Sequence, residues 1–523
     1  MSVLFFGNDC AGQVDVIFDA SELLESGTVS FCWDTIPERY YTLSESDDLS
    51  DWTVTNGTLP AHGEINSTTY DHVLGSIASA QFFQITEGRT VSEPENLLFI
   101  ILDDWGIDAS PIDNSVPPAG QLANMPHLAD LAADGVRFTN FYVVPSCAPT
   151  RAAIMTGRHA HQTDVYVAGN SRLFSVNSDE LTIAEAMDAA GSTYAKALVG
   201  KWHLGSADDA YDTVGGWDEF YGIENSGVAD YFSWDKNTNG TVATSTTYTT
   251  TDQVNEAVDF IARSELASKP WFCWLAFNAP HSPFHDPPTT LAPVGGYSTQ
   301  QSGESNNAWR YRKMLEALDT ELGRLMESVD LTKTNVILIG DNGTPGGAVQ
   351  APFGSGRAKG SLYEGGTRVP LVVAGPSVTV SNGSTTDELV HAVDLFPTLL
   401  ELVGVDPETV ASSEVLDQTR SFLPILVGDE SADRFISYEG GDGGVGGDRA
   451  RGIRVEAYSD YKLIIFSDPE DDTVPTSFEF YDLSNDENEQ SPLDTQNLDA
   501  TEQAAYDACL AIDAALGGGF LNP

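Results

Sequence analysis

The sequence predicts an α/β fold with a doubly wound, mostly parallel sheet flanked by helices, and three observations indicate it. The apolar run NLLFIILDD, which starts at Asn96, is typical of a strand buried on both faces of a parallel sheet. Further apolar runs alternate with helical patterns along the chain, as expected for strands joined by crossover helices. The chain of 523 residues is also long enough for this domain and one or two smaller ones.

Residues 1–92 precede this pattern and contain short β segments separated by turn residues. They predict a β-rich, sandwich-like accessory domain, with glutamates around Pro94 marking the linker. A structural role for this domain is favoured over carbohydrate binding. The segments are VDVIFDA, TVSFCW, YYTLSES, DWTVTNGTLP and AQFFQITEG.

Residues 93–425 carry the predicted catalytic α/β domain. Two helical patterns, MPHLADLAADG and LTIAEAMDAAG, end in glycine, which favours a helix C-terminus there. WRYRKMLEALDTELGRLMESV predicts a long amphipathic helix. Besides the first strand, the predicted strands are YAKALVG, PWFCWLAF, TNVILIGDNG and VPLVVAGP.

Residues 426–523 predict a C-terminal α+β subdomain. FISYEG, GIRVEAY, YKLIIFS and FEFYDL read as a small antiparallel sheet, and TEQAAYDACLAIDAAL as a closing helix.

The charge of the chain restricts its partners. A net charge of −53 disfavours nucleic acid and anionic membranes and is typical of an acidic shell on a protein that works in salty water. No apolar run reaches the roughly 20 residues that span a bilayer. The first residues show no signal peptide, although a trimmed exported protein would look the same. We expect a periplasmic or extracellular location.

The five cysteines fall into different settings. Cys10 and Cys32 lie in one segment and could form a local disulfide. Cys273, inside WFCWLAF, is expected to be a buried inert thiol, and Cys509 belongs to the C-terminal helix. Cys147 lies outside these settings and in a different kind of motif.

Polar side chains follow two of the predicted strands. Asp103 and Asp104 end one strand, and Asp341 and Asn342 end another. Because open α/β sheets bind ligands at the carboxyl ends of their strands, these oxygens predict a Ca²⁺ or Mg²⁺ site. The alternative is that the aspartates cap the following loops.

The segment PSCAPTRAAIMTGRHAHQT predicts a helix that begins near Cys147. Free backbone N–H groups and the helix dipole would then favour an anion at this position. Arg151 follows one helical turn later and can lie on the same side. Taken alone, these features also fit a buried structural cysteine.

Several motifs together resemble the type I sulfatases of the alkaline phosphatase superfamily. The Cys-x-Pro-x-Arg core is present at Cys147–Arg151, and Thr156-Gly157-Arg158 follows it. The second motif, GKWHLG, begins at Gly200. The resemblance covers roughly residues 94–495, in the order of the family. The other matching motifs are GDNG from Gly340, KGSLYEGGTRVPL from Lys359, HAVDLFPTLLELVGV from His391 and FYDLSNDENE.

The resemblance implies that Cys147 is oxidised to formylglycine by a formylglycine-generating enzyme. The hydrated aldehyde would attack the sulfate ester with one hydroxyl and expel sulfate through the other, which divides the reaction into two easier steps. The implied metal ligands are Asp103, Asp104, Asp341, Asn342 and modified Cys147, around Ca²⁺ in preference to Mg²⁺.

Further site residues are carried over by position from the same resemblance. Arg151 would stabilise the aldehyde hydrate, while Lys201 binds sulfate and His203 takes the proton when sulfate is eliminated. His281 would be the general acid for the departing alcohol, alone or with Lys359, which otherwise binds sulfate. Each could instead be a structural or solvent-facing residue. Candidates for contacting substrate beyond these are His159, His161, Asp164, His285, Arg357 and Arg368, although surface placement of the first three fits equally well.

The implied activity is hydrolysis of sulfate esters, of a sulfated carbohydrate or an aryl sulfate. The alternatives are a formylglycine-dependent phosphonate monoester or phosphodiester hydrolase, and a non-catalytic protein that binds sulfated glycans. A two-zinc phosphatase is disfavoured because Asn342 stands where such an enzyme needs a histidine.

Overall fold

The computed structural model describes residues 94–516 with gaps at 113–121, 167–179, 206–214, 430–433, 442–448 and 468–474, and the strands of the first 93 residues. The chain divides into two compact units, Met1–Pro94 with Asp429–Ala432 and Glu95–Gly428 with Asp433–Pro523. The sequence-based domain boundaries after residues 92 and 425 stay predictions.

The described residues of the first 93 are all in strands, which form two sheets. The predicted pairing of Cys10 with Cys32 concerns side chains outside the described residues. One sheet has the order β1 (Leu4–Phe5), β7 (Phe82–Arg89), β4 (Arg39–Ser46) and β5 (Thr53–Pro60), and the other β2 (Ile17–Phe18), β3 (Thr28–Asp34) and β6 (Ser67–Val73).

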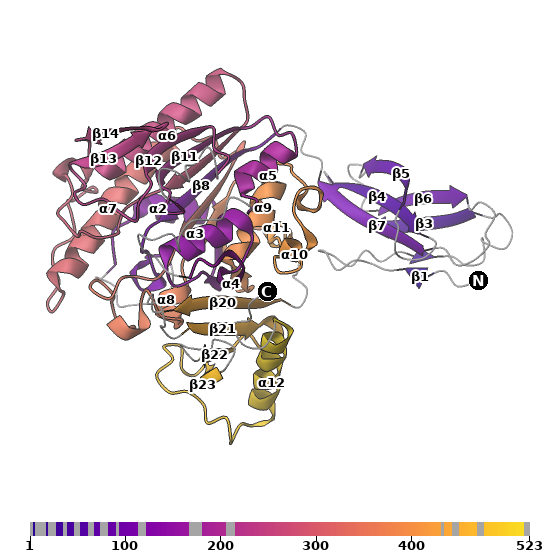
Figure 1. The fold of residues 1–523 in the computed structure, drawn as a ribbon. Coiled ribbons are helices and arrows are strands. Elements are labelled where there is room, and N and C mark those ends of the chain that lie inside the picture. Colours follow the sequence, from indigo (N-terminus) through magenta and orange to yellow (C-terminus); the bar gives the residue numbers. More distant parts are fainter. Residues whose placement is uncertain are drawn as a thin grey trace. The chain divides into compact units, whose positions relative to one another are not determined.

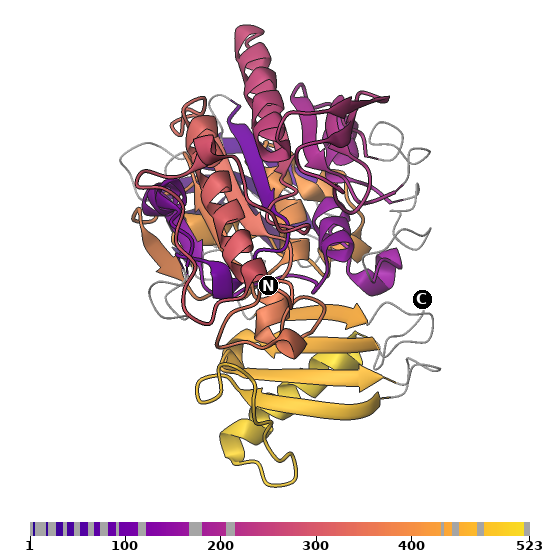
Figure 2. The same ribbon diagram turned by 90° about the vertical axis from the view of Figure 1, so that its left-hand side faces the viewer.

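A ten-stranded sheet forms the centre of the second unit (Figures 1 and 2). Its middle is parallel and has the order β12 (Glu219–Ile223), β11 (Ala195–Lys201), β15 (Trp271–Ala276), β8 (Asn96–Leu102) and β16 (Thr334–Gly340). All seven residues of β8 are buried, as its apolar run predicts. The remaining strands are β13 (Trp234–Thr238) and β14 (Thr241–Ser245) at one edge, and β17 (Leu371–Ala374), β9 (Gly135–Phe138) and β18 (Ser384–Thr386) at the other.

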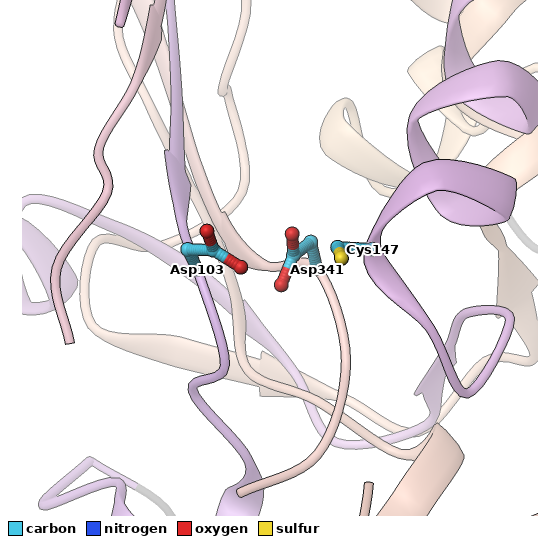
Figure 3. A group of neighbouring side chains, drawn as sticks. All are labelled: Asp103, Cys147 and Asp341. Atoms are coloured by element: carbon cyan, nitrogen blue, oxygen red, sulfur yellow. The ribbon is translucent and has the colours of Figure 1, made fainter. Parts of the chain in front are cut away.

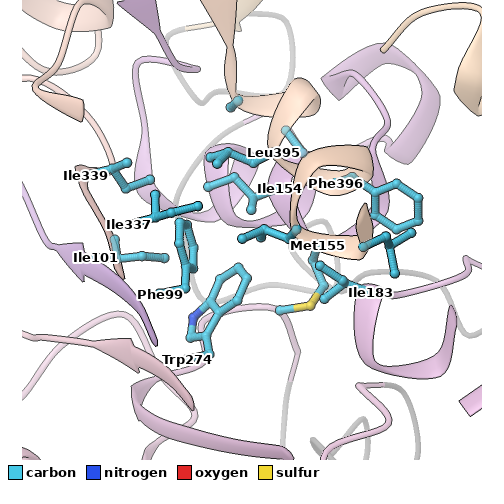
Figure 4. Close-up of a cluster of buried hydrophobic side chains, with 14 of the residues drawn as sticks. Phe99, Ile101, Ile154, Met155, Ile183, Trp274, Ile337, Ile339, Leu395 and Phe396 are labelled. Carbon is cyan, nitrogen blue, oxygen red and sulfur yellow. The ribbon is translucent and has the colours of Figure 1, made fainter. Parts of the chain in front are cut away.

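Helices cover both faces of this sheet, so the predicted doubly wound architecture is confirmed. Alternate residues of β8 belong to two cores because successive strand side chains point to opposite faces. Phe99 and Ile101 pack with α3, α5 and α9, as Figure 4 shows. The opposite face packs against α2, α6 and α7. These helices are α2 (Pro126–Ala133), α3 (Cys147–Thr156), α5 (Ile183–Ala189), α6 (Thr249–Leu266), α7 (Asn306–Met326) and α9 (Leu395–Leu402).

Local signals in the sequence explain where several helices begin. Thr182 accepts a hydrogen bond from the Glu185 amide, and Glu185 reciprocates, which forms a capping box before α5. The Ser305 hydroxyl caps α7 by accepting a hydrogen bond from the Ala308 amide. None of the helices in the described part of the chain is both long and apolar enough to cross a bilayer. Shorter helices are α4 (Ala160–Thr163), α8 (Glu364–Thr367), α10 (Ser413–Leu416) and α11 (Leu423–Leu426).

The C-terminal residues form the predicted antiparallel sheet and helix. The sheet has the order β20 (Phe435–Gly441), β21 (Arg449–Val455), β22 (Tyr461–Ser467) and β23 (Pro475–Asp482). Helix α12 (Ala500–Ala515) packs on it through a small core that contains Cys509. A two-stranded parallel pair, β10 (Phe141–Tyr142) and β19 (Val390–His391), forms a separate small sheet that packs against the C-terminal sheet through Tyr142.

Candidate active site

Four of the five predicted metal ligands, Asp103, Asp104, Asp341 and Asn342, lie together at the carboxyl ends of β8 and β16. Leu102 pairs with Gly340 in the register of these strands, so the residues that follow them emerge side by side. The Asp104 amide donates to Asp341 Oδ1 at 2.9 Å, and Asn342 Nδ2 donates to Asp104 Oδ1 at 2.8 Å. All four side chains are buried. Asp104 adopts a positive φ of 71°, which is unusual for a residue with a side chain and typical of functional sites.

Cys147 faces this cluster from the first position of α3. The ligand atoms of Asp103, Cys147 and Asp341 all lie within 4.8 Å of one another, and Figure 3 shows the three side chains close together. Asp103 and Asp341 each follow the end of a strand, and Cys147 begins the helix. Ser146 precedes the helix in an extended conformation, as expected for a residue at this boundary. The predicted helix start at Cys147 is therefore confirmed.

The oxygen atoms of the cluster fit a hard divalent cation. Asp103 Oδ1 and Asn342 Oδ1 are buried and have no hydrogen-bond partner among the described residues. An unpaired buried carboxylate oxygen is costly, and a cation would satisfy it. Three carboxylates and one amide oxygen form a donor set of the kind that Ca²⁺ and Mg²⁺ prefer.

Three basic side chains converge on the same carboxylates. Arg151 donates to Asp341 Oδ2 at 2.8 Å and to the Lys201 carbonyl at 2.9 Å. The Lys201 ammonium lies 2.7 Å from Asp103 Oδ2. Lys359 pairs with Asp104 Oδ1. Three negative and three positive groups thus share the site, and this balance makes their burial possible.

Burial and neighbouring charges shift the pKa values of Asp103 and Asp341 in opposite directions. Burial alone would raise the pKa of Asp103, but attraction from Lys201, His281 and Arg151 outweighs it and lowers that pKa. Burial and repulsion from Asp103 raise the pKa of Asp341 to about 6, despite the bond from Arg151. Burial also raises the pKa of the Cys147 thiol, although Lys201 and Lys359 act against this. An unmodified Cys147 is therefore not a ready thiolate nucleophile.

The two predicted histidines differ in their surroundings. His203 is buried, and neither ring nitrogen has a hydrogen-bond partner among the described residues. Burial and the nearby Lys201 and Arg151 lower the pKa of His203 well below its usual value, which keeps the ring neutral. His281 is partly exposed, and its Nε2 lies 3.8 Å from Asp104 Oδ2. The structure thus brings together all the residues that the sequence assigned to catalysis and metal binding.

The additional candidates lie in other settings. His159 is buried and stacks between His161 and His391, with ring centroids 5.8 and 5.3 Å away. His161 Nδ1 lies 2.8 Å from Glu439 on β20. These rings join α4 to the C-terminal sheet, so placing His159 on the surface is wrong.

Two further candidates, Arg368 and His285, are also engaged within the fold. The Arg368 side chain pairs with Glu364 at 3.2 Å. His285 Nε2 lies 3.0 Å from the Tyr248 hydroxyl, within a group of aromatic rings.

Some residues that support the site are absent from the sequence prediction. The Tyr311 hydroxyl on α7 donates to the Asp104 carbonyl at 2.7 Å. Asp108 is buried, accepts from Thr344 Oγ1 at 2.6 Å and from the Gln350 amide at 2.9 Å, and so holds the loop after Asn342. Burial raises the pKa of Asp108 to about 6, although both hydrogen bonds oppose this. The only signal in the sequence was the closeness of Asp108 to Asp104.

Comparison with known families accounts for this arrangement. Residues 95–405 match the family model described as sulfatase, which is more than half of the chain. The chain belongs to the sulfatase family. It is therefore a sulfuric ester hydrolase. Residues 358–506 also match the family model described as N-sulphoglucosamine sulphohydrolase, C-terminal. These residues of the chain include the small antiparallel sheet of β20 to β23.

Individual relatives agree with this placement. N-acetylgalactosamine-6-sulfatase of Canis lupus familiaris is 28% identical over 387 residues, which cover 67% of this chain and 69% of the relative. Arylsulfatase J of Mus musculus is 29% identical and covers 60% of this chain and 53% of its own.

Solved structures share the fold of this sulfatase. Ps i-CgsB in complex with k-i-k-neocarrahexaose superposes with a TM-score of 0.66 at 24% identity, covering 81% of this chain and 93% of its own. BT4656 in complex with D-glucosamine-2-N,6-O-disulfate has a TM-score of 0.62 at 18% identity, covering 82% of this chain and all of its own (100%).

Proposed function

We propose that this sulfatase hydrolyses sulfate esters of a sulfated carbohydrate through a formylglycine made from Cys147, with Ca²⁺ as the bound cation in preference to Mg²⁺. One observation carries the proposal: Cys147 begins a helix within 4.8 Å of Asp103 and Asp341, in a site that also contains three basic side chains.

The environment of Cys147 supports its modification. A thiol with a raised pKa is a poor nucleophile, and the neighbouring carboxylates Asp103 and Asp341 disfavour the thiolate further. As an aldehyde hydrate, residue 147 would supply one hydroxyl for attack on sulfur and a second through which sulfate is released. A formylglycine-generating enzyme is then the partner needed for maturation.

The chain's own groups have distinct roles in this proposal. Lys201 and Lys359 hold the sulfate oxygens, because both ammonium groups lie near enough to residue 147 to influence the pKa of its thiol. Arg151 fixes Asp341 and the Lys201 backbone, and so positions both elements. His281, exposed on one side, donates a proton to the departing alcohol oxygen. His203, neutral because of its low pKa, accepts the proton when sulfate leaves.

The cation proposed for the site would be held by oxygen atoms of Asp103, Asp104, Asp341 and Asn342, together with modified residue 147. When bound, it would neutralise sulfate oxygens and lower the pKa of the attacking hydroxyl. A nearly complete set of protein ligands favours Ca²⁺, since Mg²⁺ usually retains several waters.

Two lines of support favour a carbohydrate substrate. The relatives include N-acetylgalactosamine-6-sulfatases, and two structural neighbours contain k-i-k-neocarrahexaose and D-glucosamine-2-N,6-O-disulfate. The acidic composition of the chain, with 78 acidic and 25 basic residues, is in keeping with a saline setting. We therefore propose that the substrate is a sulfated polysaccharide and that the enzyme acts on it in the periplasm or outside the cell.

The deciding experiment is the mass of the peptide that spans Cys147, in protein coexpressed with a formylglycine-generating enzyme. We expect the mass of an aldehyde in place of the thiol, and activity in proportion to the modified fraction. A thiol in every active preparation would overturn the mechanism. Rates on matched aryl sulfate, phosphodiester and phosphonate esters separate the proposal from the phosphonate or phosphodiester hydrolase alternative, which predicts the higher rate on a phosphorus ester.

A further inference from the structure

Arg357 lies next to the proposed sulfate-binding lysine but outside the site described above. It ends the short 3-10 helix Ser355–Arg357, two residues before Lys359. The residue between them, Ala358, is extended, with φ −120° and ψ −163°. Side chains two residues apart in an extended chain point to the same side. Arg357 therefore shares the side of Lys359, whose ammonium contacts Asp104.

The Arg357 guanidinium has no carboxylate partner within 4 Å among the described residues, and its Nη1 has no hydrogen-bond partner there. This is unusual in a chain where acidic residues outnumber basic ones by 78 to 25. Arg151, Lys359 and Arg368 in the same region all pair with carboxylates. Arg357 hydrogen-bonds the Tyr481 hydroxyl, which carries no charge. A cation without a carboxylate partner beside a site for anions points to an anionic ligand.

The surroundings of Arg357 hold its guanidinium in place. Its central carbon lies 4.0 Å from the centroid of the Tyr363 ring. The Tyr363 hydroxyl donates to Glu479 Oε2 at 2.9 Å, and the Tyr481 hydroxyl donates to the same oxygen at 2.7 Å. Glu489, whose charge also acts on Arg357, pairs with Lys462 at 2.8 Å. The guanidinium is thus oriented by an aromatic ring while nearby carboxylates bind other groups.

We propose that Arg357 binds a second anionic group of the substrate, a sulfate or a carboxylate on the glycan beyond the sulfate that is cleaved. The inference rests on the proposed function and names its substrate class, a glycan with two neighbouring anionic groups. Residues two apart in an extended chain are separated by about 7 Å, so anions held by Lys359 and Arg357 fit within one or two sugar rings. A planar guanidinium binds sulfate or carboxylate through two parallel hydrogen bonds.

The test compares Arg357→Gln with the matched control Lys333→Gln. Lys333 has an exposed side chain and precedes β16 at the amino end of the sheet, opposite the site, so the two variants lose equal charge. The substrates are a glycan fragment with one sulfate, the same fragment with a second sulfate or with a uronate, and a small aryl sulfate.

For Arg357→Gln we expect kcat/KM on the doubly anionic fragments to fall about 10- to 100-fold, mainly through KM. Rates on the aryl sulfate and the monosulfated fragment should stay within about threefold. Arg357→Lys should recover part of the loss, because lysine keeps the charge but not the two-bond geometry. The fragment on which kcat/KM falls more, the disulfated one or the one with a uronate, shows whether Arg357 binds a sulfate or a carboxylate.

Equal losses on aryl sulfate and doubly anionic fragment, or no loss on the latter, would overturn the inference. Binding of the disulfated fragment to protein that retains the Cys147 thiol separates this result from failure of the proposed function. A weaker Kd in Arg357→Gln alone supports the anion site even if turnover follows another mechanism. An unchanged Kd refutes it.

Discussion

The ammonium of Lys201 lies 2.7 Å from Asp103 Oδ2, and neither side chain is exposed to solvent. Lys201 ends β11 and Asp103 follows β8, while β15 lies between these strands in the sheet. The contact therefore crosses the carboxyl edge of the sheet. It joins a residue proposed to bind sulfate to one proposed to bind the cation.

Replacing Lys201 by methionine should destabilise the protein strongly and reduce turnover. Loss of one partner leaves the Asp103 charge buried, at a cost of about 3–5 kcal/mol in the free energy of unfolding. The loss of a group that stabilises developing charge should lower kcat by about 100-fold or more.

Chemical denaturation and steady-state kinetics measure the two effects of Lys201→Met. Lys196→Met is the matched control, since Lys196 is also buried on β11 but pairs with the exposed Asp188. Its substitution should cost less and leave kcat nearly unchanged. Equal losses in the two variants would contradict the proposed role of Lys201.

Removal of divalent cations should abolish activity and lower the melting temperature. Ligands that bind only the folded state stabilise it by about 2.7 kcal/mol at a concentration 100 times Kd. Calcium should restore both quantities at lower concentration than magnesium, as followed by calorimetry during chelation and readdition. In Asp341→Asn the calcium-dependent rise in melting temperature should largely disappear; its persistence would place the cation elsewhere.

Gly200→Ala should be among the most damaging small substitutions in the chain. A Cβ atom at Gly200 would lie 1.8 Å from the Ala276 carbonyl oxygen, so β11 and β15 would have to separate just before Lys201. Gly191→Ala is the control: it also has a positive φ, 72° against 100°, but a Cβ there meets nothing within 4 Å. We expect about 1 kcal/mol for Gly191→Ala and several for Gly200→Ala in denaturant unfolding. Similar costs would show that conformation, and not strand spacing, sets the effect.

The buried imidazole of His159 should make stability depend on pH. Burial lowers its pKa from 6.5 to about 4, against the attraction of Glu439, so the folded protein favours the neutral ring. The stabilisation of the folded state by the neutral ring is fully present above pH 6.5. It is lost as pH falls from 6.5 towards 4, because over this range the unfolded chain binds a proton at His159 and the folded protein does not. A shift of this size corresponds to about 3 kcal/mol in the free energy of unfolding.

His159→Phe keeps an aromatic ring in the stack and should reduce the slope of stability against pH between 6.5 and 4. His127→Gln removes an exposed histidine and should leave that slope unchanged. Urea unfolding at a series of pH values gives the comparison. A slope that stays the same in His159→Phe would assign the acid sensitivity to other groups.

Local patterns in the sequence were sufficient for the elements that frame the site. The apolar run at Asn96 required a doubly buried strand, and the segment at Cys147 required a helix start; both features are set by neighbouring residues. The polar residues after β8 and β16 could be placed at one edge, because parallel strands end together. Their roles, and those of the basic residues, remain predictions that rest on the family resemblance.

Only the tertiary structure decided which side chains meet across long separations. Asp108, Thr344 and Tyr311 support the site without any motif, because their contacts depend on how distant segments pack. His159 was expected near the substrate or on the surface, yet it stacks with His391 beneath the C-terminal sheet. Arg357 was one of several substrate-contact candidates in the sequence, and it stands out only because no carboxylate of the described residues pairs with its guanidinium. A sequence determines local periodicity and strand ends, whereas burial, charge pairing and pKa values depend on the neighbours that the complete fold supplies.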